Sequence, residues 1–96
     1  MNGTTIKELC DYISHGHEAE FKYKDELYVL QSEVADGKSY LVIWKCDPDS
    51  ICICRCEIPN NDTITQDLTD KVLNEKCFEG KSFYEIESEV TIENIF

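Results

Sequence analysis

The sequence is poor in positive charge. It holds nine Lys and Arg against twenty Asp and Glu in 96 residues, so its formal net charge at pH 7 is −11. A field of this sign repels the phosphates of nucleic acids and the surface of anionic membranes, and it attracts basic protein surfaces. Direct binding to nucleic acid or to a membrane is therefore not expected, and the expected partner is a basic protein surface.

Long apolar runs and catalytic motifs are missing as well. No apolar run approaches the about 20 residues that are needed to span a bilayer. Residues 1–5 lack the basic and apolar regions of a signal peptide, so the expected location is the cytoplasm. No phosphate loop, dinucleotide fingerprint or Ser-His-Asp pattern occurs. The sequence thus predicts no enzymatic activity, no catalytic residue and no cofactor.

Length and composition predict one folded domain over residues 1–96. A chain of this size buries about 60–65% of its unfolded surface, which is enough for one modest core but not for two. The hydrophobic content of 42% and the charged content of 30% are those of a globular chain rather than a disordered one.

Three capping-box patterns predict where helices begin: Thr5–Glu8, Thr63–Gln66 and Ser82–Glu85. In such a box a hydroxyl and a longer side chain each satisfy a backbone N–H that the helix leaves unbonded. Apolar residues at helical spacing follow each box. The predicted helices cover about residues 5–15, 63–76 and 82–87.

Alternating apolar and polar residues predict strands at residues 20–24, 27–34, 38–46 and 51–58. Asp36-Gly37 is the clearest hairpin signal, whereas the connection Lys24–Glu26 lacks the glycine that a type I′ turn prefers. After Glu85 the acids alternate with apolar residues, and a closing strand is expected over residues 89–95. The predicted fold is α+β, with an N-terminal helix, an antiparallel meander of three to four strands, two short C-terminal helices and this closing strand. Exposed edge strands leave homodimerisation as an open alternative.

Four of the six cysteines fall near the last strand of the meander. They are Cys46, Cys52, Cys54 and Cys56. The last three alternate along the predicted strand, so we expect them on one face at steps of about 6.7 Å. We interpret them as small hydrophobic residues of a core face, because zinc sites use C-x₂₋₄-C turns that bring sulfurs together. A structural zinc site built from these four thiols is the alternative.

A nucleophilic cysteine is not expected. Cys10 lies in the middle of a predicted helix, and Cys77 lies at a helix C-terminus, where the helix dipole disfavours a thiolate. His15 and His17 flank the glycine that ends the first helix. We expect an imidazole there to bond the last helical carbonyls, with a role as additional zinc ligands as the alternative.

An acidic row in the C-terminal half is the main candidate site. It consists of Glu85, Glu87, Glu89 and Glu93, with Asp67 and Asp70 of the preceding helix as secondary contacts. On an extended backbone the glutamates would stand about 6.7 Å apart on one face. DNA carries one phosphate per 3.4 Å of each strand, so the row would be a sparse imitation of a phosphate backbone. The alternative is a solvated face that serves solubility.

Two parts of the chain carry a family resemblance. Residues 5–9 and 15–24 contain a helix followed by G-x-E-x-E-F-x-Y, and residues 80–86 match a closing G-K-S-hydrophobic helix. In these features the chain resembles small uncharacterised single-domain proteins of Gram-positive bacteria and their phages. The resemblance leaves out the cysteine-bearing strand, departs at Asp25-Glu26, where a turn with glycine is usual, and implies no activity. In size, acidity and α+β pattern the chain is also similar to anti-CRISPR proteins, several of which occupy the basic groove of a nuclease.

These observations predict a non-enzymatic interaction or inhibitor protein, of the kind that phages and mobile elements encode against host defence. Its acidic C-terminal half would dock on a basic nucleic-acid-binding partner such as a nuclease. The alternatives are the zinc module and a small-ligand domain. The ligand pocket would lie between the first helix and the sheet, lined by Phe21, Tyr23, Tyr40 and Trp44.

Overall fold

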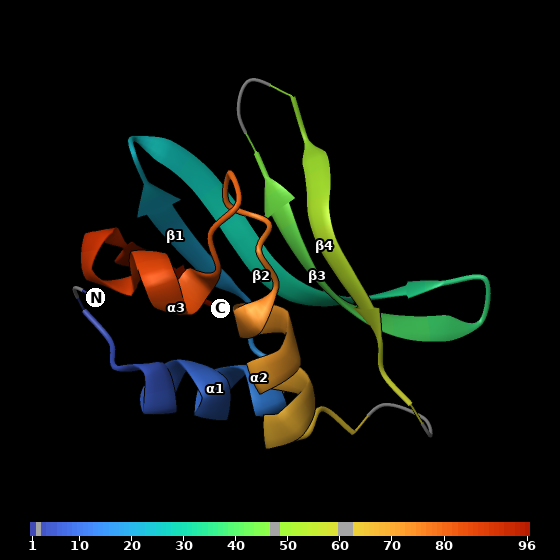
Figure 1. Cartoon of the computed structure of the whole chain (residues 1–96). Coiled ribbons are helices and arrows are strands. Elements are labelled where there is room, and N and C mark those ends of the chain that lie inside the picture. The colour runs from blue at the N-terminus through green and yellow to red at the C-terminus, as the bar shows by residue number, and fades with distance from the viewer. Residues whose placement is uncertain (2, 47–48, 60–62) are drawn as a thin grey trace.

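The chain folds into a five-stranded antiparallel sheet with its helices packed against one face (Figure 1). The structure is a computed structural model that describes residues 1, 3–46, 49–59 and 63–96. The elements in chain order are α1 (Ile6–Ser14), β1 (Ala19–Tyr23), β2 (Glu26–Ala35), β3 (Lys38–Lys45), β4 (Ile51–Glu57), α2 (Gln66–Asn74), α3 (Phe83–Ile86), the 3₁₀ helix η1 (Glu87–Glu89) and β5 (Thr91–Ile95). The predicted α+β class and the four-stranded meander are confirmed.

The strands lie in the order β4-β3-β2-β1-β5. The closing strand is confirmed, although it begins at Thr91 rather than at residue 89. It pairs with β1, so the last strand of the chain completes the sheet beside the first. This pairing places β1 in the interior of the sheet and leaves β4 and β5 as the two edges.

Two tight turns connect the first three strands. In each turn both central residues have positive φ, which is the conformation of a type I′ turn. Asp36 and Gly37 have φ of 53° and 77°, as the hairpin signal predicts, and Lys24 and Asp25 have φ of 52° and 61°. The first turn therefore forms without glycine, at a cost of about 1–2 kcal/mol for each left-handed residue, which the pairing of β1 with β2 offsets.

The helix starts follow the capping boxes in two cases of three. Thr5 and Ser82 form complete boxes at α1 and α3. The box predicted at Thr63 is wrong, because α2 begins at Gln66 and its N-cap is Thr65, whose side chain accepts from the Leu68 backbone N–H. The apolar side of α2 faces the core, where Val72 is fully buried.

The core is centred on aromatic rings between the sheet and the helices. Phe21 of β1 stacks on Tyr28 of β2 with ring centroids 5.3 Å apart. Phe83 of α3 meets the same Phe21 ring edge-on at 5.3 Å, and Phe78 lies 6.1 Å from it. Offset and edge-on pairs of this kind stabilise a core beyond the area that they bury. The N-terminal strand and the C-terminal helix are thus joined through one ring.

Replacing Ser82 with alanine should lower the free energy of unfolding by about 1–2 kcal/mol. Ser82 is only 3% exposed, its hydroxyl accepts from the Glu85 N–H at 3.2 Å, and its own N–H donates to the Glu85 carboxylate at 3.0 Å. Urea denaturation followed by circular dichroism measures the loss. Thr5→Ala removes the matching box of α1 at an exposed position and should cost less. Equal losses in the two variants would show that burial of Ser82 adds nothing to the strength of its cap.

Candidate functional site

The predicted acidic row does not form one face. Glu85, Glu87 and Glu89 lie on the helical backbone of α3 and η1, and only Glu93 lies on an extended strand. Glu93 meets Lys22, whose neighbours on β1 are buried in the core, so this pair projects from the opposite face of the sheet. Ile86 and Val90 explain the error, because both are fully buried while Ser88 between them is exposed, whereas a strand would place all three on one face.

Three of the four glutamates also meet a cation of the chain itself. Glu85 lies 3.3 Å from Lys76, Glu93 lies 3.5 Å from Lys22, and Glu87 lies 3.7 Å from the amino group of Met1. The hydrogen bond from the Ser82 backbone, and then Lys76, lower the pKa of Glu85. Much of the negative charge predicted for this row is therefore balanced within the fold.

A second group of acids is exposed on the packed helices α1 and α2. It consists of Glu8 and Asp11 of α1 with Asp67 and Asp70 of α2, and we call it the acidic helix face. All four residues are exposed, and α1 packs directly against α2. Among the described residues none of the four carboxylates has a Lys or Arg within ion-pair distance. One of the four, Asp11, lies 3.7 Å from the imidazole of His15.

The acidic helix face contains the two secondary contacts that the sequence predicts and two residues that it does not. Glu8 and Asp11 are three positions apart and flank the buried residues Leu9 and Cys10, so their outward position could have been inferred from helical spacing. Asp70 also accepts a hydrogen bond from the hydroxyl of Tyr84 on α3. That bond fixes one carboxylate of the acidic helix face against the third helix.

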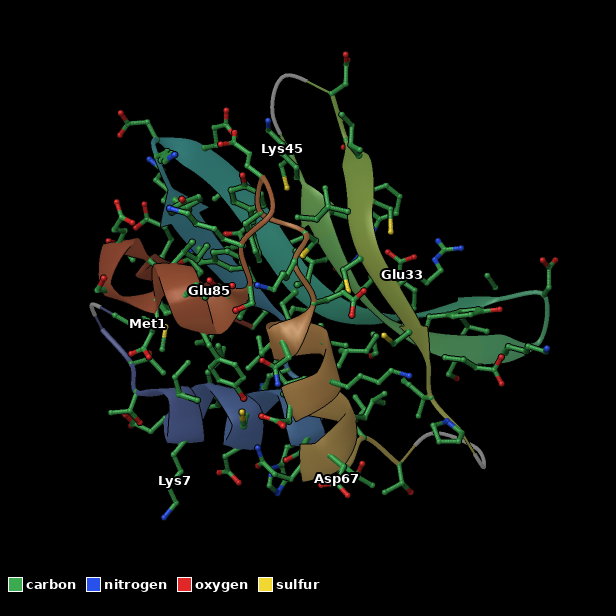
Figure 2. The ribbon with its side chains drawn as sticks, viewed as in Figure 1. Met1, Lys7, Glu33, Lys45, Asp67 and Glu85 are labelled. Carbon is green, nitrogen blue, oxygen red and sulfur yellow. The ribbon has the colours of Figure 1, made fainter. Side chains whose placement is uncertain are left out.

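A groove runs along this surface between α1 and the start of α2. Its volume is about 530 Å³, and it is lined by Lys7, Glu8, Asp11, Ser14 and Gln66. Figure 2 shows Lys7 and Asp67 projecting from the same outer side of the helix pair, away from the sheet. Lys7 is the cation of this lining, so the groove offers two carboxylates beside one ammonium group. Its chemistry suits a basic side chain entering from a partner.

Most charged side chains on the opposite face of the sheet are paired with one another. Two ion pairs there join neighbouring strands, Lys22–Glu93 at 3.5 Å and Lys38–Glu57 at 3.7 Å. A third, Arg55–Glu33 at 3.8 Å, joins β4 to β2 across β3. Beneath them Val42 is fully buried, although it lies outside the core cluster on the helix side. Three of the acids on this sheet face are therefore paired with a base of the same chain.

The cysteines of β4 do not share one face, contrary to prediction. A register shift between Ile43 and Trp44 pairs Cys54 with Ile43 but Cys52 with Trp44, and adjacent residues of a strand point to opposite faces. Cys54 lies in the core and Cys56 packs against it, as expected for small hydrophobic residues. Within the described ranges no three His, Cys, Asp or Glu side chains converge in a group that could hold a metal ion. The zinc alternative therefore has no geometric support.

The four aromatics proposed to line a ligand pocket are also divided. Phe21 and Tyr23 are buried in the core on the helix side. Tyr40 and Trp44 lie on the other face, where the Arg55 guanidinium stacks 5.2 Å from the centre of the Tyr40 ring. A shared pocket between the first helix and the sheet is thus excluded for these residues.

The two histidines bond backbone carbonyls. The His15 Nδ1–H donates to the Asp11 carbonyl at 2.8 Å, which confirms the predicted role at the end of the first helix. The His17 Nδ1–H donates to the Phe96 carbonyl at 2.8 Å, and this bond ties the end of the chain to the start of β1. Both rings therefore have structural roles at these nitrogens.

In the part of the chain that the structure describes, no helix is long and apolar enough to cross a membrane. Comparisons of the chain with protein-family models, with curated proteins and with solved structures find no match.

Proposed function

We propose that this chain is a non-enzymatic binding protein that docks an acidic surface on a basic, nucleic-acid-binding partner. An inhibitor of a nuclease, encoded by a phage or mobile element in the manner of anti-CRISPR proteins, fits this description. The observation that carries the proposal is the acidic helix face, whose four exposed carboxylates have no Lys or Arg partner among the described residues. This proposal keeps the acidic docking surface that the sequence predicts, but it assigns that surface to α1 and α2 instead of to the C-terminal row.

Rigid helices present this charge. The buried sides of α1 and α2 hold both helices on the core, so their outer carboxylates keep a constant spacing without a partner. A preorganised charged surface accelerates association with a surface of opposite sign and selects the docking orientation. The groove beside Glu8 and Asp11 gives an incoming Lys or Arg side chain a recess to enter.

The same charge argues against two other partners. Nucleic acid carries phosphates that the field of a chain with net charge −11 repels. Two copies of the chain that met through the acidic helix face would also repel each other. A homodimer would have to use another surface, such as the edge strand β4.

Charge reversal tests whether binding depends on the acidic helix face or only on the net charge of the chain. The variant Asp11→Lys/Asp67→Lys changes the acidic helix face, whereas Glu57→Lys/Glu93→Lys makes the same change of net charge on the opposite face of the sheet. With each variant as bait, partners are captured from the native host at low salt and eluted with a salt gradient. We expect the first variant to lose at least tenfold of the captured basic protein and the second to retain it, since only the first alters the docking surface.

Retention by the wild-type chain should also weaken as salt rises, because exposed charges are screened within about 8 Å at physiological ionic strength. Equal losses of captured protein in the two variants would show that binding depends only on net charge. A loss confined to Glu57→Lys/Glu93→Lys would show that the binding site lies on the sheet face. A complex that survives high salt unchanged would refute the proposal.

A further inference from the structure

The strand β4 (Ile51–Glu57) forms one edge of the sheet (Figure 1). In the described part of the chain it pairs with β3 alone, so one side of its backbone meets no other strand. Such an edge presents N–H and C=O groups that a further strand can bond. Proline and lysine, which often protect an edge, are both missing from the sequence of β4.

The hydrogen bonds to β3 show which residues of β4 point away from the sheet. The Ile58 N–H donates to the Ser39 carbonyl at 2.8 Å, and the pairing with β3 stays in register back to Cys54. Both backbone groups of a strand residue point to one side, and those of the next residue point to the other. Every second residue back from Ile58 therefore bonds β3, whereas Arg55 and Glu57 direct their N–H and C=O groups outward.

Two bulges distinguish β4 from β5, the other edge of the sheet. The pairing leaves out Ile53 on β4, so the stretch 54–57 beyond it is regular. On β5 the pairing leaves out Glu93, which lies in the middle of this five-residue strand. A bulge twists an edge and interrupts its pairing, so β5 is the better protected of the two edges.

The two outward residues of β4 carry opposite charges. The side chain of Arg55 is 45% exposed and that of Glu57 is 54% exposed. Each has a partner in its own chain, Glu33 at 3.8 Å from Arg55 and Lys38 at 3.7 Å from Glu57. Exposed ion pairs of this kind contribute little stability, so both charges can also serve a docked strand.

We propose that two copies of the chain pair through β4 in antiparallel orientation, with the two-fold axis at Cys56. Arg55 of each copy then lies opposite Glu57 of the other, and each of these pairs exchanges both of its N–H···O bonds. The two five-stranded sheets become one continuous sheet.

The charges select this register. Opposite charges that face each other across two strands stabilise the pairing, and like charges destabilise it. A slide of two residues in one direction would place Arg55 opposite Arg55, and a slide in the other direction would place Glu57 opposite Glu57. A slide of one residue would set outward backbone groups against inward ones. The edge is therefore complementary to a second copy of itself in one register.

The edge also suits a second copy of an acidic chain. Arg55 and Glu57 sum to zero charge, whereas the whole chain carries −11. The acidic helix face belongs to α1 and α2 and not to the paired strand. This inference concerns β4 alone and does not depend on the proposed basic partner.

Charge exchange across the paired strands tests the register. Arg55→Glu places two acids opposite each other in both pairs, and Glu57→Arg places two bases there. We expect sedimentation velocity over a concentration series to show a wild-type dimer, and each variant to self-associate at least about tenfold more weakly. The double variant Arg55→Glu/Glu57→Arg should dimerise like the wild type. A mixture of the two single variants should form a heterodimer, because each supplies the charges that the other lacks.

Matched controls separate the register from net charge. Lys22→Glu on β1 and Glu93→Arg on β5 change the net charge by the same amounts and should leave the dimer intact. Circular dichroism shows whether each variant is folded. A wild-type chain that stays monomeric up to about 1 mM would overturn the proposal. Self-association that follows net charge in every variant, or folded single variants that form no heterodimer, would overturn it as well.

Hydrogen exchange locates the interface in the wild-type chain. The amides of Arg55 and Glu57 bond the other copy in the dimer, so their exchange should slow as the protein concentration rises. The amides of β5 should exchange at a constant rate. Concentration-dependent protection on β5 in place of β4 would contradict the proposed edge.

Discussion

The variant Phe21→Ala is expected to lose about 3–5 kcal/mol of unfolding free energy, as large buried aromatic residues do when they are truncated. Phe21 is fully buried, and its ring contacts Tyr28, Phe78 and Phe83, which belong to three separate parts of the chain. Alanine would remove the transfer free energy of the ring and leave a cavity that three rigid neighbours cannot fill. A domain of this size has about 5–15 kcal/mol of stability, so the variant should be marginally folded.

Urea denaturation followed by circular dichroism measures this loss. Val34→Ala is the matched control, because Val34 is also an apolar strand residue but is 76% exposed. Its stability should stay within about 0.5 kcal/mol of the wild-type value. A loss in Phe21→Ala no larger than that of Val34→Ala would show that the aromatic cluster does not link the two ends of the chain.

The variant Glu33→Ala should cost about 1–3 kcal/mol on the sheet face opposite the helices. One carboxylate oxygen of Glu33 accepts hydrogen bonds from the Trp44 indole and, at 2.9 Å, from Gln31. The other oxygen lies 3.8 Å from Arg55. The Glu33 side chain is only 25% exposed, so its removal leaves a half-buried indole N–H and a guanidinium without their acceptor.

Trp44 is the single tryptophan of the chain, so its fluorescence reports this site directly. Besides the loss of stability in urea, we expect the emission to move to longer wavelength as water replaces the carboxylate. Glu57→Ala breaks a more exposed ion pair, with Lys38, and should cost less than about 1 kcal/mol. Unchanged emission together with a cost equal to that of Glu57→Ala would show that the bonds to Glu33 contribute no more than an ordinary surface pair.

Local sequence patterns predicted most of the secondary structure. Hydroxyl residues followed by glutamate marked the starts of α1 and α3, and Asp36-Gly37 marked the β2–β3 turn. These signals are local, since each depends on hydrogen bonds or dihedral angles within about four residues. The same approach was wrong at Thr63, because two threonines two positions apart can both cap a helix and the pattern does not say that Thr65 is the one that does.

The predicted acidic row does not form one face for a related reason. Between Glu85 and Glu93 the acids follow strand spacing in part, while the four-residue spacing of Ile86 and Val90 fits a helix and a strand alike. A local pattern cannot decide between helix and strand, and the exposure of Ser88 between the two buried residues settled the matter in favour of a helix. Asp67 and Asp70, which the sequence names as secondary contacts, are exposed on α2.

The sequence by itself determined the net charge, the α+β class and the ends of most elements, because these follow from composition and from interactions between near neighbours. Only the tertiary structure decided which acids stand on neighbouring helices and which of them meet a lysine of the same chain. Those facts depend on packing α1 against α2, α2 against β4 and β5 against β1. Such contacts join residues far apart in the chain, and no local pattern records them.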